Sequence, residues 1–361
     1  MRYLAIFIAS FTILSSSAMA QEEMQLVGKI QQPIAKPSKT IVKSMKAKQN
    51  QRLLPTSVTL LKVKLSDQAW TKIQLNTATP ATEPQGNYIK GNANRVQLGM
   101  NQVPVFDQGP HSTCATFANT AAVDAALNRG DYISELCLLQ LGRYLENHAY
   151  TLSGWDGSFG PIVLNQMQVF GLVNKETQRT KGCNGYTEYP TSSSDEPQTE
   201  LSITDYHELS EPMPEDQVAW TPILDAYQVF IDKVDPQKTL EQVFKSLDAG
   251  DRLTFGILLF RLDQGIAGAV GKHQVNNDTW VLTPEIIQAI YSKGEVGAHE
   301  MIITGYDHDA IAIDEHGRPH KGLLTLRNSW GQQLGDQGDF YMSYDYFKTL
   351  VVEIQRIRSA N

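Results

Sequence analysis

The order of helical and strand patterns along the chain limits its fold more than any other feature. Residues 114–128, "CATFANTAAVDAALN", favour a helix that stops at Gly130, and Ser134 is a suitable N-cap for a second helix. Further helical patterns occupy "IVLNQMQVFGL", 219–233 and 239–250, whereas strand patterns occupy 252–260, 299–307, 321–330 and 338–347. Helices first and strands later predict an α+β protein with two segregated lobes and a site in the cleft between them.

The first twenty residues, "MRYLAIFIASFTILSSSAMA", have the pattern of a secretory signal peptide. Arg2 precedes an apolar run from Tyr3 to Leu14, and Ala18-Met19-Ala20 forms a small-residue cleavage site. The run is too short to span a bilayer, although an N-terminal membrane anchor remains the alternative. We therefore expect a secreted or periplasmic protein that has no membrane contact once the signal is removed.

The net charge of −8 is unevenly distributed. Residues 21–95 carry twelve Lys/Arg and four Asp/Glu, whereas residues 96–361 are strongly acidic. Such a basic tract suits nucleic acid, anionic lipid or an acidic protein surface. It lacks the interleaved aromatic residues of a nucleic-acid reader, so we expect no nucleic-acid binding and predict that the tract docks on the acidic body.

The basic tract also differs from the rest of the chain in its structural pattern. Its prolines predict a weakly structured segment over 21–60, "TLLKVKL" within 57–75 alternates as a strand does, and 76–95 has the composition of an exposed linker. The composition becomes globular from about Val96. The acidic, Pro/Ser-rich stretch 190–218 predicts a surface insertion.

The chain has only three cysteines, Cys114, Cys137 and Cys183, and an odd number in an exported protein leaves at least one thiol unpaired. Cys114 stands where the loop "DQGPHST" gives way to an alanine-rich helix. A free cysteine is usually a small buried apolar residue. At the start of a helix, however, the unpaired N–H groups and the macrodipole favour a thiolate, so a nucleophile, half of a disulfide and a buried apolar residue all stay open.

A cysteine nucleophile needs a base and a group that orients it. His299 begins the strand pattern "HEMIITGYD", Asn328 lies in "LRNSWG", and Gln108 precedes Cys114 by six residues. Taken singly, these residues read as a strand-edge histidine, a turn asparagine and a surface glutamine. Taken together, in this order along the chain, they indicate a candidate catalytic set.

Three blocks together resemble the papain-like cysteine peptidases. "VPVFDQGPHSTCATFANTAAVDAAL" is similar to the family's Gln-to-Cys segment, "GAHEMIITGYD" to its His strand and "GLLTLRNSWGQQLGDQGDFYMSYDYF" to its Asn strand. The resemblance spans about residues 98–350. It implies a two-lobed papain-like fold, with a helical left lobe, an antiparallel β-barrel-like right lobe and the active site in the cleft between them.

The resemblance also implies a role for each matching residue. Cys114 is the nucleophile, and His299 is the base that takes its proton and leaves a thiolate–imidazolium pair. Asn328 orients the imidazole, and Gln108 joins the Cys114 backbone N–H in an oxyanion hole. Trp330 shields the Asn–His hydrogen bond and borders the substrate site.

Three departures from the family pattern are visible. His111 replaces a cysteine that normally forms a disulfide, and Ala115 replaces a bulky aromatic residue beside the nucleophile. The interval from Cys114 to His299 exceeds the usual roughly 130–150 residues. We assign the excess to the acidic insertion and the helix after it.

With Cys114 as the reactive thiol, the resemblance leaves Cys137 and Cys183 as the natural disulfide pair, the alternative being two buried thiols. The glycine loop "SGWDGSFGP", 153–161, lies where the family has a loop that pairs with the substrate chain. Gly157 and Ser158 are the predicted contacts there, unless the loop is a plain connection.

We therefore predict residues 1–20 as a signal peptide, 21–95 as a basic proregion and linker, and 96–361 as the catalytic domain with an insertion around 190–235. The predicted activity is that of a monomeric cysteine endopeptidase acting on polypeptides, made as a zymogen whose proregion occupies the cleft and is removed near residues 76–97. No cofactor or metal is expected, since the His/Asp-rich stretch 306–321 lies between two strand patterns and reads as a solvated hairpin turn. The alternatives are a catalytically impaired papain-fold binding protein and a binding protein whose basic arm is the functional part.

Overall fold

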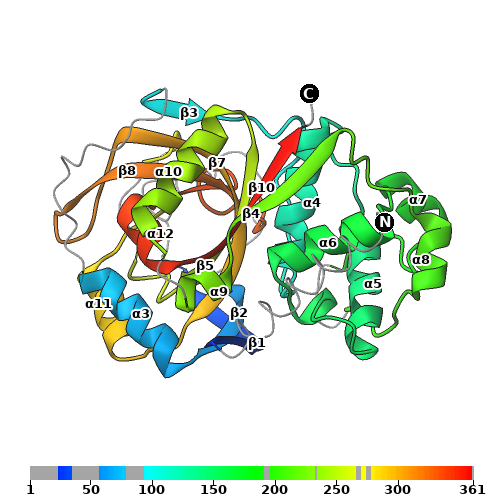
Figure 1. The fold of residues 1–361 in the computed structure, drawn as a ribbon, viewed down its shortest axis with the longest axis horizontal. Coiled ribbons are helices and arrows are strands. Elements are labelled where there is room, and N and C mark those ends of the chain that lie inside the picture. The colour runs from blue at the N-terminus through cyan, green and yellow to red at the C-terminus, as the bar shows by residue number, and fades with distance from the viewer. Residues whose placement is uncertain are drawn as a thin grey trace, which may run out of the picture.

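The computed structural model describes residues 23–34, 57–78, 93–190, 196–231, 234–265, 270–273 and 278–359. The predicted signal peptide and most of the predicted linker therefore lie outside the described residues. The described chain forms a strand-rich lobe and a helical lobe, which Figure 1 shows on the left and the right. This arrangement confirms the α+β prediction with two segregated lobes.

The strand-rich lobe is built on a sheet whose main path runs β4-β10-β5-β7-β8-β9-β6. Its strands are β4 (Val218–Leu224), β5 (Arg252–Leu259), β6 (Thr279–Trp280), β7 (Gly297–Ile313), β8 (Pro319–Arg327), β9 (Asp339–Ser343) and β10 (Val351–Ser359). Central β5 is buried along its whole length, which accounts for its nearly continuous apolar sequence. The pairings along the path are antiparallel except for β6 with β9, which is parallel.

The predicted β-barrel-like lobe needs one correction. Within the described ranges the sheet is an open path that ends in β4 and β6, and no hydrogen bonds join these two strands. β6 is only two residues long and pairs with β9, so it offers too little edge to close the sheet.

The helical lobe contains α4 (Cys114–Leu127), α5 (Glu135–Asn147), a 3₁₀ turn (Gly154–Asp156), α6 (Gly160–Phe170), α7 (Lys175–Lys181) and α8 (Ile203–Leu209). Helix α4 ends at Asn128, whose left-handed conformation is a common helix stop, and the Ser134 hydroxyl caps α5 by accepting from the N–H of Cys137. α4 packs against β7, β5 and β10 on one side and against α5 and α6 on the other, so it lies between the lobes (Figure 1). Its residues from Cys114 to Ala125 are all buried.

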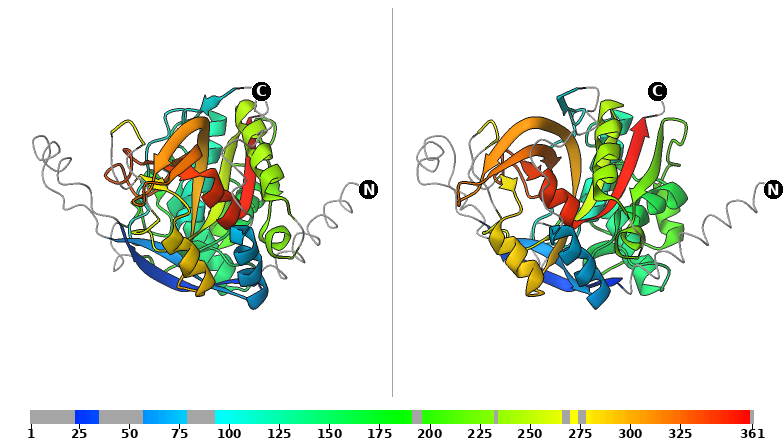
Figure 2. Two further views of the ribbon diagram at one scale, coloured as in Figure 1. Left: turned by 90° about the vertical axis from the view of Figure 1, so that its left-hand side faces the viewer. Right: turned by 60° about the vertical axis from the view of Figure 1, so that its left-hand side comes forward.

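The N-terminal segment is an integral part of the strand-rich lobe. β1 (Met24–Pro33) and β2 (Ser57–Leu65) form an antiparallel hairpin, and β2 also pairs with β7 through Leu61–Ala298 and Lys62–Gly297. α3 (Asp67–Ala78) follows and packs against α11 (Pro284–Tyr291) and α12 (Tyr344–Leu350). Figure 2 shows the hairpin in dark blue along the lower edge of both views. We call β1, β2 and α3 the N-terminal segment below.

Several element predictions are corrected by the structure. Residues 24–33 form a strand rather than a weakly structured segment, because β2 supplies hydrogen-bond partners that lie far along the sequence. Residues 218–224 form β4 rather than a helix, since the edge of β10 is available to them, and only the short α9 (Ala226–Phe230) is helical there. The strand predicted over 338–347 turns into α12 at Tyr344.

The remaining elements are short or follow the expected pattern. β3 (Arg95–Gln97) pairs with β7, and α10 (Pro236–Asp248) covers most of the helix expected at 239–250. Asp235 caps α10 by accepting from the N–H groups of Gln237 and Lys238, with Pro236 at the first helical position. No helix in the described ranges is long and apolar enough to cross a membrane.

Candidate active site

His299 and Asn328 form the centre of the site. His299 lies near the start of β7, and Asn328 follows the last residue of β8, its antiparallel neighbour. His299 Nε2 donates to Asn328 Oδ1 at 2.7 Å, in the tautomer that leaves Nδ1 free to accept a proton. The Trp330 indole stacks on the imidazole, with ring centroids 4.5 Å apart and planes at 24°. The ring is thus fixed by an amide oxygen and covered by an indole.

Cys114 opens α4 and is 1% exposed. The backbone N–H groups of Glu300 and Ala115 favour its thiolate, which places the sulfur beside the residue that follows His299. Burial and the Glu300 carboxyl act in the opposite direction and prevail, raising the pKa of the thiol to about 12.

The base is also neutral in this arrangement. Burial lowers the pKa of His299 to about 4, although the hydrogen bond with Asn328 favours the charged imidazole. His299 Nδ1, the ring nitrogen that does not face Asn328, is buried and makes no hydrogen bond. In the full chain, burial thus disfavours the charged forms of both groups, which opposes the expected thiolate–imidazolium pair.

Gln108 is held in place by both its backbone and its side chain. Its N–H donates to the carbonyl of Ser329 at 2.8 Å, and its Oε1 accepts from the Ser329 hydroxyl at 2.7 Å. One hydrogen of Nε2 points to the carbonyl of His111, with an Nε2–O distance of 2.8 Å, which leaves the other for a ligand. Ser329, which sequence reasoning missed, joins Gln108 to Asn328; its place inside the "NSW" motif was the available signal.

His111 is completely buried, and its surroundings account for its departure from the family pattern. Its ring meets Trp155 and Tyr189 edge to face, at centroid distances of 5.3 and 5.7 Å. Its Nδ1 lies 3.2 Å from Glu196, a carboxylate that also pairs with Arg143 at 2.7 Å. Packing and this ion cluster thus hold the loop before Cys114 at a position where the family pattern has a cysteine.

Tyr189 fixes the same loop from the other side. Its hydroxyl lies 2.9 Å from that of Thr113 and donates to the carbonyl of Gln108 at 3.0 Å. Thr113 is the N-cap position of α4, but its side chain makes no capping bond. The ring of Tyr189 also packs edge to face on Phe117, at 5.0 Å, against the first turn of α4. Sequence reasoning missed Tyr189, because nothing local in the sequence links it to residues 108–117.

The predicted substrate contacts are covered by the N-terminal segment. Gly157 has a φ of +114°, and a Cβ there would lie 2.4 Å from Cδ2 of Leu61 and 3.3 Å from Cδ1 of Leu26. Leu61 also pairs with Ala298, the residue before His299. The Ser158 hydroxyl, by contrast, donates to the carbonyl of Leu152 at 3.3 Å, so it is engaged within its own loop.

A protein-family model matches the C-terminal part of the chain. Residues 225–358 match the model of the Peptidase C1-like family, and this stretch contains His299, Asn328 and Trp330. No curated protein matches the sequence.

Several solved structures of cysteine proteases are similar to this chain. Xylellain, a cysteine protease from Xylella fastidiosa, shares 17% identity at a TM-score of 0.46, over 76% of this chain and 90% of that one. Digestive procathepsin L 3 of the Tenebrio molitor larval midgut shares 15% at 0.45, over 81% and 78%. The cysteine protease and lectin-like domains of Cwp84 from Clostridium difficile share 15% at 0.47, over 93% of this chain and 62% of theirs.

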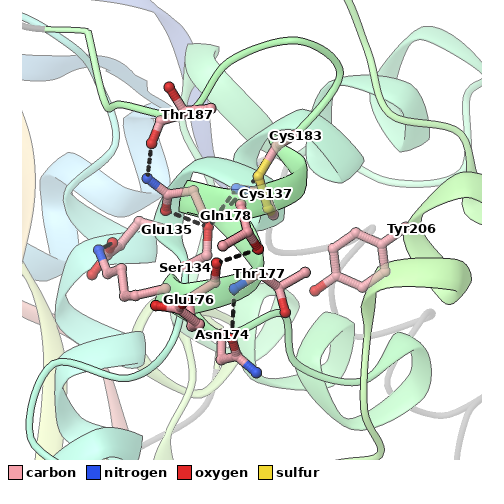
Figure 3. Close-up of a disulfide and its surroundings, with 12 residues drawn as sticks. Ser134, Glu135, Cys137, Asn174, Glu176, Thr177, Gln178, Cys183, Thr187 and Tyr206 are labelled. Carbon is pink, nitrogen blue, oxygen red and sulfur yellow. Dashed lines mark hydrogen bonds and ion pairs between the residues drawn. A yellow bond between two sulfur atoms is a disulfide. The ribbon is translucent and has the colours of Figure 1, made fainter.

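A disulfide joins Cys137 of α5 to Cys183, which follows α7 (Figure 3), and Cys114 is the free cysteine. Polar bonds surround the bridge: the Ser134 hydroxyl donates to Gln178 Oε1 at 2.7 Å, and Gln178 Nε2 donates to the carbonyl of Thr187 at 2.8 Å. The bridge anchors the start of the loop that leads to Tyr189.

The His/Asp-rich stretch 306–321 spans the β7–β8 hairpin, with Ile311 opposite Lys321 and Ile313 opposite Pro319. This confirms the predicted turn. Close by, Glu285, Glu315 and His316 bring three possible metal-ligand atoms within 4.8 Å of one another. Glu315 and His316 are exposed, and exposed acidic clusters are common without an ion, so the group carries no assignment.

Proposed function

We propose that the protein is an exported cysteine endopeptidase in which Cys114, His299, Asn328 and Gln108 hydrolyse peptide bonds, and that its N-terminal segment keeps the enzyme latent. The observation that carries the proposal is the His299 ring, held between Asn328 and Trp330 beside the helix that Cys114 opens. Export is inferred from residues 1–20, and the enzyme is proposed to act as a monomer.

In the proposed mechanism, His299 Nδ1 takes the proton of the Cys114 thiol, and the sulfur forms a bond to the carbonyl carbon of the substrate. The backbone N–H of Cys114 and the free hydrogen of Gln108 Nε2 stabilise the oxyanion. The C–N bond then breaks as the imidazolium gives its proton to the leaving amine, which yields a thioester. Water, deprotonated by His299, hydrolyses the thioester and restores the thiol.

Latency is supported by two contacts of Leu61 in the N-terminal segment. Leu61 lies on Gly157 and pairs in β-sheet fashion with Ala298, so β2 occupies the space that an extended substrate needs. Leu61 is 4% exposed, so the contact is tightly packed.

Two ion pairs join the basic side of the N-terminal segment to the acidic body. Lys29 lies 3.1 Å from Glu196, and Lys62 lies 2.9 Å from Glu295. Both lysines are at least one-third exposed, so these pairs stabilise the docked segment only weakly and less at high salt.

The test is covalent labelling with an epoxysuccinyl thiol trap. Because Cys137 and Cys183 are bridged, Cys114 is the thiol available for labelling. Labelling of the processed protein at Cys114, absent from Cys114→Ala, is expected together with peptide hydrolysis. The unprocessed chain is expected to label slowly.

Two outcomes would contradict parts of the proposal separately. Processed protein that neither labels nor cleaves any peptide in a chromogenic library would favour a catalytically impaired binding protein of the same fold. A full-length chain that labels as fast as the processed one would leave the peptidase assignment intact and remove the latency role of the N-terminal segment.

A further inference from the structure

Glu300 and Glu353 lie side by side on the face of the sheet that meets the helical lobe. The strand register pairs both with Gly256 of β5, Glu300 from β7 and Glu353 from β10. Residues directly opposite each other on neighbouring strands project to the same face, and Gly256 contributes no side chain there. A Cβ at Gly256 would lie 2.9 Å from Cγ of Glu353. The two carboxyl groups thus occupy the space above a glycine.

A second glycine closes this space from the helical lobe. Gly160 is the first residue of α6, and its N–H donates to Glu353 Oε1 at 2.9 Å. A Cβ at Gly160 would lie 2.6 Å from Oε1 of Glu300, so the backbone of α6 touches both carboxyl groups. Glu300 is 3% exposed and Glu353 4%, which means that the slot between the lobes is closed to solvent.

The slot is connected to the nucleophile through α4. Asn119 Nδ2 donates to Glu300 Oε1 at 2.6 Å and to the carbonyl of Ala115 at 2.8 Å, so one amide joins Glu300 to the residue after Cys114. The hydroxyl of Thr254 donates to Asn119 Oδ1 at 2.8 Å, which fixes the orientation of that amide. The acid pair therefore helps to hold the first turn of α4 on the sheet.

Nothing positive faces the pair in the described contacts. The titratable group of α4 that lies beside Glu300 is Cys114. The carboxyl group of Asp225 acts on Glu353, and α6 has no titratable residue. On β5, the guanidinium of Arg252 is bonded to the carbonyls of Gly250 and Gly99. Two anions in such a closed slot repel each other without compensation, so full ionisation is strongly disfavoured.

We propose that Glu300 and Glu353 share one proton and act as a positioning pair: the singly protonated pair holds α4 against the sheet, and its full ionisation suppresses the Cys114 thiolate. A proton shared at neutral pH requires that the pKa of the pair be raised. Burial, and then the neighbouring Glu353, raise the pKa of Glu300 well above its usual value, and burial raises the pKa of Glu353 to about 7. The inference rests on the proposed role of Cys114 for its catalytic meaning, but not for its test.

The test titrates the single free thiol of the full-length chain by the ultraviolet absorbance of its thiolate, with Cys114→Ser as the blank. Glu300→Gln keeps the shape and the acceptor for Asn119 but removes the charge beside the sulfur. We expect the thiol to titrate about one pH unit or more lower in this variant. Glu353→Gln should shift it less, because Glu300 still ionises. Glu146→Gln, in the last turn of α5, is the control and should leave the titration unchanged.

A thiol midpoint in Glu300→Gln equal to that of the wild type would overturn the proposal. A second measurement does not depend on the variants folding. In infrared spectra of the wild-type chain labelled with ¹³C-glutamate, a protonated glutamate C=O band should persist at pH 7 and weaken in Glu353→Gln; its absence from the wild type would also overturn the proposal. Both readings need no turnover, so a chain that fails as a peptidase still gives a clear answer here.

Discussion

His299 and Glu300 are neighbours on β7, yet their side chains lie on opposite faces of the strand and contact different kinds of groups. His299 meets a neutral amide and an indole, whereas Glu300 meets a second carboxyl group. Burial acts in the same chemical sense on both, since it disfavours the charged imidazole and the charged carboxylate alike. Burial therefore favours a neutral imidazole on the His299 face of the strand and a protonated carboxyl group on the Glu300 face.

The two faces also differ in what covers them. The region around His299 is covered in part by β2, through the pairing of Leu61 with Ala298. β2 belongs to the N-terminal segment, which maturation is proposed to remove. The slot around Glu300 is covered by α4 and α6, which belong to the helical lobe itself. Activation should therefore change the chemistry of the first face and leave the second unchanged.

The largest expected effect comes from removing the base on the first face. His299→Ala should lower kcat/KM of the processed enzyme by about 10²- to 10⁴-fold, because general-base catalysis contributes this range. Peptide hydrolysis under initial-rate conditions is the measurement. A variant that retains more than a tenth of the wild-type rate would show that His299 is not the base.

The second-largest effect is expected when the His299 face of β7 is uncovered in the unprocessed chain. Leu61→Asp places a charge where a buried leucine contacts Gly157, and the lost burial plus the desolvated charge should loosen β2 and raise Cys114 labelling about 100-fold. Leu75→Asp is the matched control, since Leu75 lies on α3 and is 61% exposed. Equal labelling of the two variants would mean that Leu61 does not cover the site.

The acid pair on the Glu300 face should affect how the free energy of unfolding depends on pH. Burial raises the pKa of Glu353 from 4.5 to about 7, so its contribution to stability is present below pH 4.5 and is lost as the pH rises through about 7. Glu353→Gln should remove this loss, and the difference between wild type and variant should change by about 2 kcal/mol from pH 4 to pH 8. Urea unfolding at each pH measures it. Parallel curves for the two proteins would contradict the assignment.

The smallest effect is expected at the join between Gln108 and the Asn328 loop. Ser329→Ala removes the hydroxyl that donates to Gln108 Oε1, a buried hydrogen bond worth about 1 kcal/mol, so kcat should fall about fivefold with KM unchanged. Ser329→Thr keeps the hydroxyl and should retain most of the activity. If the threonine variant loses as much as the alanine one, packing rather than the hydrogen bond is responsible.

Three sequence blocks were sufficient to nominate the candidate site, because each keeps its residues at fixed spacing within one local element. His299, Asn328 and Trp330 lie close together in the structure, and Cys114 opens its helix where the loop ends. The disulfide of Cys137 with Cys183 followed from an odd cysteine count and the role assigned to Cys114.

Features that depend on strand register were not predictable. β1 was missed because its partner lies some thirty residues later, beyond three prolines. Glu300 looked like one polar residue in a strand pattern, and only the pairing of β5 with both β7 and β10 brings it beside Glu353. The pKa of the Cys114 thiol also depends on burial by segments distant in the sequence, and this burial disfavours the expected thiolate in the full chain.

The N-terminal segment adds strands to the sheet and buries Leu60, Trp70 and Ile73 in the same apolar core as the strand-rich lobe. Cutting the chain between residues 78 and 93 would therefore leave every one of these contacts in place and change only the connectivity. Before the cut, the segment rebinds at the millimolar effective concentration typical of a tethered partner; afterwards, rebinding becomes a second-order reaction. Activation of the proposed peptidase should then depend on dilution, with the processed chain inactive at high concentration and gaining activity as the sample is diluted.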